Sequence, residues 1–143
     1  MQTFLPYRSF KKTAKVLDYR RLGKQRVEAF QILNTIEIKK TNPKVGWSNH
    51  PAVLMWEGFE LALSEYFNIM VLEWIDRGYN NNMGLVHIID PIVYPPWLGS
   101  KKFHISHRSN LLRKDFNYYS QFNWNVSDDL EYVWPVRKET NEN

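Results

Sequence analysis

Apolar residues recur at helical spacing in two long segments of the first half of the chain. In LGKQRVEAFQILNTIEIKK they fall every three or four positions, which predicts a helix that Asp18 caps and that ends near Asn42. A second helix is predicted from Asn49 as N-cap, with Pro51 in its first turn, to Gly78. The apolar face of this second helix is the broader of the two, so we expect it to form the core.

The second half of the chain has a different pattern. Residues 78–99 are rich in Asn, Pro and Gly and cannot sustain a long helix. Residues 85–89 are apolar enough for a short strand, but no partner strand is evident. Helical periodicity resumes at Ser100 and predicts a third helix. An aromatic packing segment follows, and the chain ends in a polar tail from about residue 137. We therefore predict an all-α fold in which residues 1–143 form a single compact domain of three main helices with long irregular connections.

The composition excludes several classes of protein. The chain contains no cysteine, which rules out disulfide scaffolds, cysteine nucleophiles, thiolate zinc sites and iron–sulfur clusters. Its 143 residues match the usual size of one domain. The start lacks the apolar core of a signal peptide, and no apolar run approaches the roughly 20 residues that cross a bilayer. We expect a cytoplasmic, monomeric protein that does not bind membranes.

Charge is distributed unevenly along the chain. Residues 1–28 contain eight bases and two acids, and residues 101–114 contain five bases and no acid. Between them, residues 51–76 contain five acids and no base. Two basic segments separated by an acidic one predict a face that contacts a polyanion. Solvated lysines on ordinary helices explain the charge equally well.

Common nucleotide-binding and hydrolase motifs are absent from the sequence. His104-x-x-His107 places two imidazoles on neighbouring turns, but a metal site needs a further ligand such as His50 or His87. Because the pair lies beside Arg108 in a basic helix, we expect phosphate contact or local capping, with no metal and no cofactor.

The segment RRLGKQRVE places one carboxylate among several cations. Lys24 and Glu28 are i,i+4 neighbours, and Arg21 lies a turn earlier. A carboxylate so placed can stabilise a developing cation on a substrate whose phosphates the bases hold. A plain intrahelical salt bridge explains the same spacing. Gly23 interrupts the helix at a nominal cost of about 1 kcal/mol relative to alanine, which suggests that another backbone or a ligand approaches closely there.

A family resemblance is carried by five spans: MQTFLPY, LDYRRLGKQRVEA, GWSNHPAVLMWEG, PPWLG and SHRSNLLRKD. They resemble the pyrimidine-dimer DNA glycosylases of the phage endonuclease V type, in the branch typical of bacterial and large-viral genomes. The inosine-directed enzyme of the same name is a different protein. The resemblance reaches nearly to the end of the chain, up to VWPV. It follows the family's order of a basic helix, an acidic helix that begins with NHP, and a basic aromatic helix.

The resemblance implies a small all-α DNA repair enzyme with glycosylase and abasic-site lyase activity, acting without metal or cofactor on double-stranded DNA that contains damaged or modified bases. In the family, the α-amine of the mature N-terminus attacks C1′ of the damaged nucleotide, expels the base and leaves a Schiff base. A helix glutamate, which matches Glu28 by order and spacing, stabilises the cationic sugar and assists β-elimination of the 3′ phosphate. An α-amine suits this role because its ordinary pKa of about 7.7–8.0, against about 10.4 for lysine, leaves a neutral fraction at pH 7.

Three residues are candidates for the amine nucleophile. Phage members of the family have a small residue after the initiator methionine, and the methionine is removed. This chain has Gln2 at the second position. A large second residue blocks removal, so the α-amine of Met1 is the first candidate. Gln2 is the second, although an N-terminal glutamine can cyclise and lose its amine. Lys24 is the third, because Arg21 and Arg26 beside it favour its neutral form.

A glycosylase of this type must distort the duplex and hold both strands. We expect phosphate contacts from two groups of basic residues, Arg20, Arg21, Lys24 and Arg26 in the first and His107, Arg108, Arg113 and Lys114 in the second. The candidates for stacking or minor-groove contacts are Trp47, His50, Tyr118 and Tyr119. Core packing is the competing interpretation of these aromatic rings, and we assign Trp134 to packing.

Two alternative functions stay open at this point. A related glycosylase for another damaged or modified base would use the same chemistry, because base choice depends on pocket shape and on the cost of extrusion. In a catalytically silent nucleic-acid-binding helical domain, Glu28 would be a salt-bridge partner and nothing more.

Overall fold

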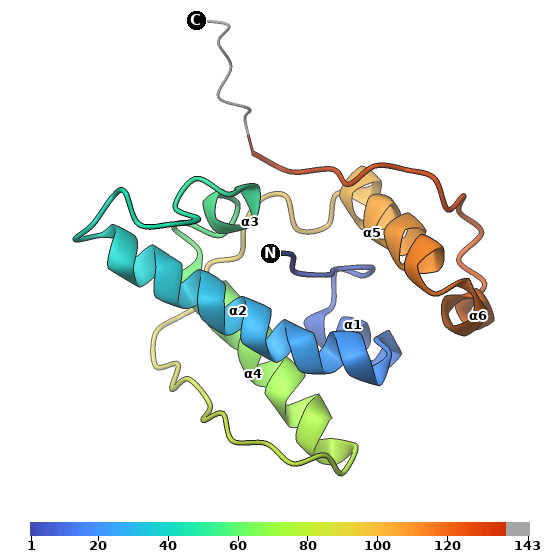
Figure 1. The fold of residues 1–143 in the computed structure, drawn as a ribbon, viewed down its shortest axis with the longest axis horizontal. Helices are drawn as coiled ribbons and strands as arrows, with labels where there is room; N and C mark the ends of the chain where they lie inside the picture. The colour runs from blue at the N-terminus through green and yellow to red at the C-terminus, as the bar shows by residue number, and fades with distance from the viewer. Residues whose placement is uncertain (137–143) are drawn as a thin grey trace, which may run out of the picture.

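The computed structural model describes residues 1–136, so the polar tail expected from about residue 137 lies outside the described residues. The described chain forms six α-helices and a short 3₁₀ helix, with no strand. The helices are α1 (Phe10–Val16), α2 (Tyr19–Lys39), α3 (Pro51–Leu54), α4 (Glu60–Asp76), α5 (Lys101–Lys114) and α6 (Phe116–Tyr119), followed by the 3₁₀ helix η1 (Ser120–Phe122). The all-α prediction is confirmed, and the three longest helices, α2, α4 and α5, correspond to the three predicted main helices (Figure 1). None of the helices within residues 1–136 combines the length and apolar character needed to cross a bilayer.

Helix α2 begins where the sequence predicts, after Asp18. The Asp18 carboxylate accepts a hydrogen bond from the backbone N–H of Arg21 and so satisfies one of the free N–H groups of the first turn. The most extensive helix contact is between α2 and α4, which cross in Figure 1. Near this contact, a Cβ on Gly23 would lie 2.7 Å from the ring of Trp74. The close approach inferred at Gly23 therefore exists, but a side chain makes it, not a backbone or a ligand.

The second predicted helix is divided into α3 and α4. Helix α3 starts at Pro51 and is capped by His50 rather than Asn49, with His50 Nδ1 accepting a backbone N–H at 3.0 Å. The chain then turns before α4 starts at Glu60. Gly58 in this turn has a φ of +90°, a conformation that glycine adopts without steric cost and that ends a right-handed helix. Apolar residues face the same core on both sides of the turn, which is why the periodicity predicted one continuous helix.

Two shorter segments were not assigned from the sequence. Helix α1 has the sequence FKKTAKV, too short for its apolar spacing to show, and the hydroxyl of Ser9 caps it by accepting the N–H of Lys12 at 3.1 Å. Residues 85–89 form no strand in the described structure, and Leu85 and Ile89 are exposed. A strand there would need a neighbouring strand to pair with, and residues 1–136 contain none.

The N-terminal segment, residues 1–8, passes through the middle of the molecule without forming a helix. Figure 1 shows the N-terminus near the centre of the view, surrounded by the helices. Thr3, Phe4 and Leu5 are buried, and the two apolar ones belong to the core. Because a buried backbone needs hydrogen-bond partners, side chains of the surrounding helices must supply them.

Candidate active site

The first residue of the chain lies beside the carboxylate of Glu28. The α-amino nitrogen of Met1 is 3.9 Å from Oε1 of Glu28, and the exposed fractions of the two side chains are 6% and 12%. Glu28 lies on the buried face of α2, and the N-terminal segment brings Met1 to it. A primary amine and a carboxylate are thus adjacent, which is the pair of groups that imine formation with proton transfer requires.

Lys24, a further candidate nucleophile, lines the same groove as Glu28 but makes no ion pair with it in the part of the chain that the structure describes. The competing interpretation of their spacing, a plain i,i+4 salt bridge, is therefore not the geometry observed. The carboxylate of Glu28 faces the α-amine of Met1 instead.

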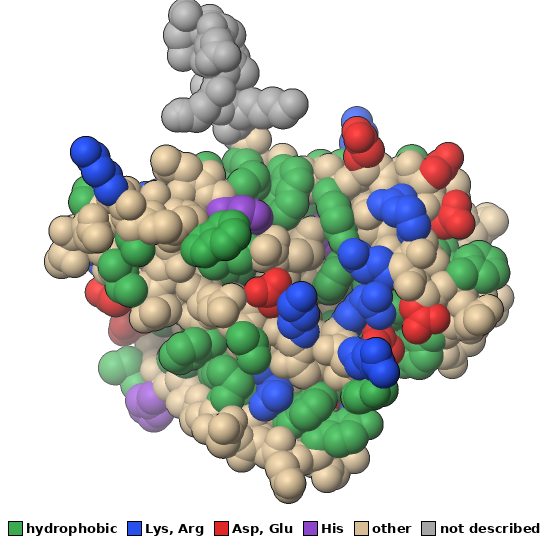
Figure 2. All heavy atoms as spheres, viewed as in Figure 1, with side chains coloured by type: hydrophobic (Ala, Val, Ile, Leu, Met, Phe, Trp, Pro, Cys, Tyr) green, Lys and Arg blue, Asp and Glu red, His purple; other side chains and the backbone are tan. Residues whose placement is uncertain are grey.

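One side of the Met1–Glu28 pair opens into a groove of about 450 Å³, which we call the basic groove. Its lining includes four cationic side chains and one carboxylate, in the set Met1, Gln2, Phe4, Arg20, Arg21, Lys24, Gln25, Glu28, Lys114, Tyr132 and Trp134. Lys and Arg side chains gather near the centre of this face of the molecule (Figure 2). Burial, followed by the nearby charges of Arg21, Arg113 and Lys24, lowers the pKa of Lys114. The groove therefore has the charge expected of a site for a polyanion.

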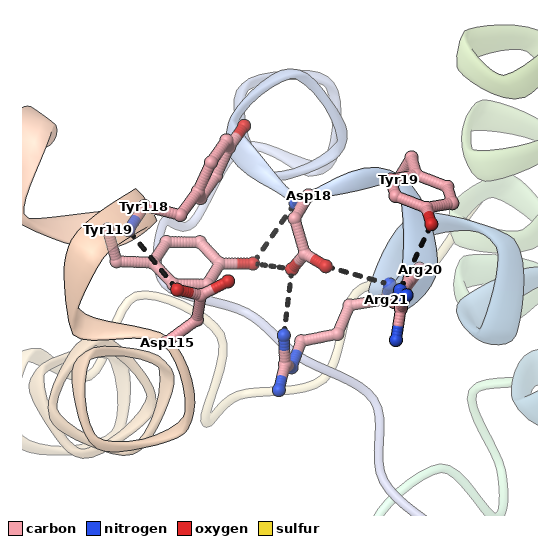
Figure 3. Close-up of polar contacts among 7 residues, drawn as sticks. All are labelled: Asp18, Tyr19, Arg20, Arg21, Asp115, Tyr118 and Tyr119. Atoms are coloured by element: carbon pink, nitrogen blue, oxygen red, sulfur yellow. Dashed lines mark hydrogen bonds and ion pairs between the residues drawn. The ribbon is translucent and has the colours of Figure 1, made fainter.

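Asp18 connects Arg21 to Tyr119, a contact between α2 and α6 (Figure 3). Nη1 of Arg21 donates to Oδ1 of Asp18 at 3.1 Å, and the Tyr119 hydroxyl donates to the same oxygen while accepting the backbone N–H of Asp18 at 3.1 Å. Burial opposes the charge of Asp18, but the hydrogen bonds from Tyr119 and Arg21 outweigh it and lower the pKa of the carboxyl group. Beside them, Nε of Arg20 donates to the hydroxyl of Tyr19 at 3.0 Å.

A second pocket, of about 310 Å³, adjoins the same amine and carboxylate, and we call it the amide pocket. It is lined by Met1, Glu28, Gln31, Asn34, Thr35 and Trp47. Gln31, Asn34 and Thr35 were not among the site residues predicted from the sequence. Gln31 and Thr35 lie three and seven residues after Glu28, on the same face of α2. This helical spacing was the signal that could have identified them.

An aromatic row borders the site. Trp47 is 63% exposed and has a φ of +70°, uncommon for a residue with a side chain. Its ring lies 5.7 Å from that of His50, which lies 5.9 Å from that of Trp134. Burial and the nearby terminal amine lower the pKa of His50, while Glu28 opposes this shift. Trp134, assigned to packing from the sequence, packs against the core and also lines the basic groove.

Four of the predicted phosphate contacts do not line the basic groove, and three of these are the arginines Arg26, Arg108 and Arg113. The guanidinium of Arg26 lies over the ring of Trp74 at 4.2 Å. Nε of Arg108 donates to the backbone carbonyl of Pro6 at 2.7 Å, and Arg113 donates to backbone carbonyls of the C-terminal segment. These three side chains hold other parts of the fold, a distinction that a count of basic residues along the sequence does not reveal.

Three further candidates take part in packing. His107 is 1% exposed, its ring centroid lies 4.4 Å from that of Phe103, and burial lowers its pKa to about 3. Tyr119 is fully buried and stacks on Trp124 at 5.6 Å, while the half-buried ring of Tyr118 meets Tyr119 edge-on at 4.8 Å. A surface for DNA phosphates or bases would need these groups to be accessible, and His107 and Tyr119 are not.

The described residues contain no group of three or more His, Cys, Asp or Glu side chains that could hold a metal ion. His104 and His107 are hydrogen-bonded to the backbone of Leu5 instead.

A family model for pyrimidine dimer DNA glycosylases matches residues 1–86 of the chain. The matched region includes Met1, Glu28 and the three cations that α2 contributes to the basic groove, whereas Lys114 and Trp134 lie beyond it. No curated protein and no solved structure matches the chain significantly.

Proposed function

Since the chain belongs to the pyrimidine dimer DNA glycosylase family, we propose that it excises pyrimidine dimers and then cleaves the resulting abasic site, with the α-amine of Met1 as nucleophile and Glu28 as its acid–base partner. The observation that carries this proposal is the 3.9 Å contact between the two groups at the basic groove. An amine at this position would meet the sugar of a nucleotide whose phosphates lie along the groove.

The proposed reaction begins with the uncharged amine of Met1. Its nitrogen forms a bond to C1′ as the bond from C1′ to the base breaks, and the base leaves with the bonding electron pair and takes up a proton. Loss of a proton from the nitrogen and opening of the sugar ring then give a Schiff base. Removal of a C2′ proton by the Glu28 carboxylate breaks the bond from C3′ to the 3′ phosphate oxygen, which completes β-elimination. Water finally hydrolyses the imine and frees the enzyme.

The position of Glu28 supports both of its proposed roles. Its carboxylate lies close to the attacking nitrogen, so it can stabilise the positive charge that develops on the sugar and on the iminium ion. Its side chain is mostly shielded from water, and electrostatic interactions are stronger where water is excluded. It is also the one carboxylate in the lining of the basic groove.

Recognition of the duplex is assigned to the residues that surround this pair. Arg20, Arg21, Lys24 and Lys114 would contact backbone phosphates, since they supply the positive charge of the groove. The exposed ring of Trp47 would stack on a base or sugar at the edge of the site. The remaining phosphate and stacking candidates are not included, because the structure shows them engaged in packing or in holding loops.

The amide pocket is the proposed position of an extruded base. Gln31 and Asn34 carry both donors and acceptors, which suit the hydrogen-bonding edge of a nucleobase, and the pocket shares Met1 and Glu28 with the basic groove. Base selection and sugar chemistry would then use different side chains of one helix.

Covalent trapping with borohydride tests the proposal directly. The intact mass of the purified full chain first establishes that residue 1 is Met with a free amine. The protein is then incubated with borohydride and a duplex that contains either a thymine dimer or an abasic site, so that any Schiff base is reduced to a stable adduct. Peptide mapping locates that adduct. We expect an adduct on the α-amine of Met1 with both duplexes, and none when that amine has been acetylated.

Other outcomes would contradict parts of the proposal. An adduct on Lys24 would overturn the assignment of the nucleophile. Trapping on abasic duplexes without any action on dimers would indicate a glycosylase for a different damaged or modified base. Duplex binding with no adduct on either substrate would leave a non-catalytic DNA-binding domain.

A further inference from the structure

The two histidines of His104-x-x-His107 bind both polar backbone groups of Leu5. The N–H of Leu5 donates to Nδ1 of His107 at 3.0 Å, and Nδ1 of His104 lies 2.7 Å from the carbonyl oxygen of Leu5. Helix α5 carries both histidines, which lie 99 and 102 residues after Leu5 in the sequence. We call this contact the histidine clamp.

Hydrogen bonding identifies the tautomer of each ring. The N–H of Gly99 donates to Nε2 of His104 at 2.9 Å, so Nε2 is an acceptor and the proton is on Nδ1, which donates to the Leu5 carbonyl. His107 accepts at Nδ1 and therefore carries its proton on Nε2. Both rings are buried and neutral, and burial lowers the pKa of each one.

The clamp belongs to a series of side-chain contacts along the N-terminal segment. Nε1 of Trp56 donates to the hydroxyl of Thr3 at 3.0 Å, and the Phe4 N–H donates to Oε1 of Gln25 at 3.0 Å. Gln25 lies on α2 three residues before Glu28, so this contact joins the segment to the helix that carries the carboxylate. Three consecutive residues, starting two positions after Met1, are therefore held by side chains of the surrounding structure.

We propose that the histidine clamp is a positioning device, in which His104 and His107 hold the backbone of Leu5 so that the α-amine of Met1 lies at the Glu28 carboxylate. This inference rests on the proposed function and adds two positioning residues to it. Both histidines lie beyond residues 1–86, the part of the chain that the family model matches. A segment without regular secondary structure has no helix of its own to hold its first residue in place, and the neighbouring α5 supplies that restraint.

The test replaces each histidine in two ways. His107→Leu removes the acceptor for the Leu5 N–H, whereas His107→Asn keeps an acceptor oxygen near the position of Nδ1. His104→Leu and His104→Asn form the corresponding pair, in which the asparagine keeps a donor for the Leu5 carbonyl. The measured quantities are the borohydride-trapping rate on saturating abasic duplex, the affinity for undamaged duplex, and amide hydrogen exchange of residues 1–8 without DNA.

We expect the leucine variants to trap more slowly by a factor on the order of 10², because a small displacement of a reacting group has effects of that size. Their affinity for undamaged duplex should be unchanged, and amide exchange should accelerate in residues 1–8. The asparagine variants should recover most of the rate. The matched control is Asn110→Leu, since Asn110 is equally buried on α5 but donates to the carbonyl oxygens of Ser106 and Leu130, away from the N-terminal segment.

Two results would overturn the proposal that the histidine clamp positions Met1. One is a wild-type trapping rate in both leucine variants. The other is an equal loss of rate in Asn110→Leu, which would mean that general destabilisation of α5 is the cause. A failure of the proposed function looks different, because the wild-type protein itself would then give no adduct. In that case hydrogen exchange decides the inference alone, and unchanged exchange of residues 1–8 in the leucine variants would refute it.

Discussion

Glu28 is 9% exposed and faces a terminal amine, an environment that differs from that of an ordinary helix glutamate. Exposed i,i+4 pairs on helices contribute little to stability and have no chemical role. A buried carboxylate next to a primary amine has a desolvation cost that a purely structural contact does not need. This contrast is what makes Glu28 the residue to test first.

Replacement of Glu28 by glutamine keeps the shape of the side chain and removes its charge. We expect the rate of β-elimination on abasic duplex to fall by about 10²–10⁴-fold, the usual contribution of general acid–base catalysis. Duplex binding should be retained, because the change removes a negative charge from the basic groove. Single-turnover cleavage and a binding titration measure the two quantities separately.

Glu37 provides the control for this experiment. It lies on the same helix but is exposed and paired with Lys40 at 3.4 Å, so Glu37→Gln should cleave at the wild-type rate. Cleavage at the wild-type rate by the Glu28 variant as well would remove the carboxylate from the mechanism.

At the scale of elements, the contact between α2 and α4 depends on the absence of a side chain at Gly23. Helix propensity alone predicts that Gly23→Ala stabilises α2 by about 1 kcal/mol. In the structure, the new Cβ would meet two ring atoms of Trp74 at 2.7 and 2.9 Å. Trp74 cannot easily move away, because its Nε1 donates to the Asn80 carbonyl at 2.7 Å and Arg26 lies over its ring.

We therefore expect Gly23→Ala to lower the free energy of unfolding by about 1–3 kcal/mol, as overpacking usually does. Urea denaturation measures this change. A Cβ on Gly84 would have no atom within 4 Å, so Gly84→Ala should leave the unfolding midpoint nearly unchanged. An increase in stability for Gly23→Ala would show that the two helices can separate without cost.

The second element-scale prediction concerns the joint between α6 and α2. The hydroxyl of Tyr119 meets both the carboxylate and the backbone N–H of Asp18 in a buried position (Figure 3). Tyr119→Phe leaves these groups without their partner, which should destabilise the protein by about 1–3 kcal/mol. It should also weaken duplex binding, because Arg21 is held by the same carboxylate.

Tyr118→Phe is the matched control for this joint. Tyr118 is the neighbouring residue and, within the described residues, its hydroxyl makes no hydrogen bond. Its loss should leave both the thermal midpoint and duplex affinity close to wild type. Equal behaviour of the two variants would show that the Asp18 contact does not couple α6 to α2.

At the scale of the whole molecule, the N-terminal segment occupies the centre of the core and depends on neutral histidines. In the folded protein burial lowers the pKa of His107 to about 3, whereas in the unfolded chain a histidine titrates near its ordinary value of about 6.5. Between these values the unfolded state binds a proton that the folded state does not. Stability is therefore highest above about pH 6.5 and falls as the pH decreases toward 3, by up to about 1.4 kcal/mol per pH unit for this group.

Urea unfolding between pH 7 and pH 4 measures this dependence. The lowered pKa of Asp18 makes the protein lose stability in the same direction at the acidic end, so the informative quantity is the difference between the wild type and His107→Asn, which cannot titrate at this position. We expect the variant to lose less stability per pH unit over this range. Identical slopes would show that the pKa of His107 is the same in the folded and unfolded states.

Much of this fold follows from local pattern. The period of the apolar residues determined the all-α class and the three main helices, and Asp18 determined where α2 begins, because helix spacing and capping depend on neighbours in the sequence. The division between α3 and α4 was not predicted. It depends on a left-handed conformation at Gly58, and the helical spacing of apolar residues continues across this position.

Within the site, the sequence alone, through composition and resemblance, selected Met1, Glu28 and the cations of α2 as candidates. Tertiary structure decided which of them meet. It placed the terminal amine at Glu28 and Lys114 in the basic groove, whereas Arg26 lies over Trp74 and His107 is buried in the core. The physical reason is that sequence spacing specifies which side chains share one helix face. It does not specify the path of the buried N-terminal segment or its contacts with α5, about a hundred residues later. These depend on how the whole core packs.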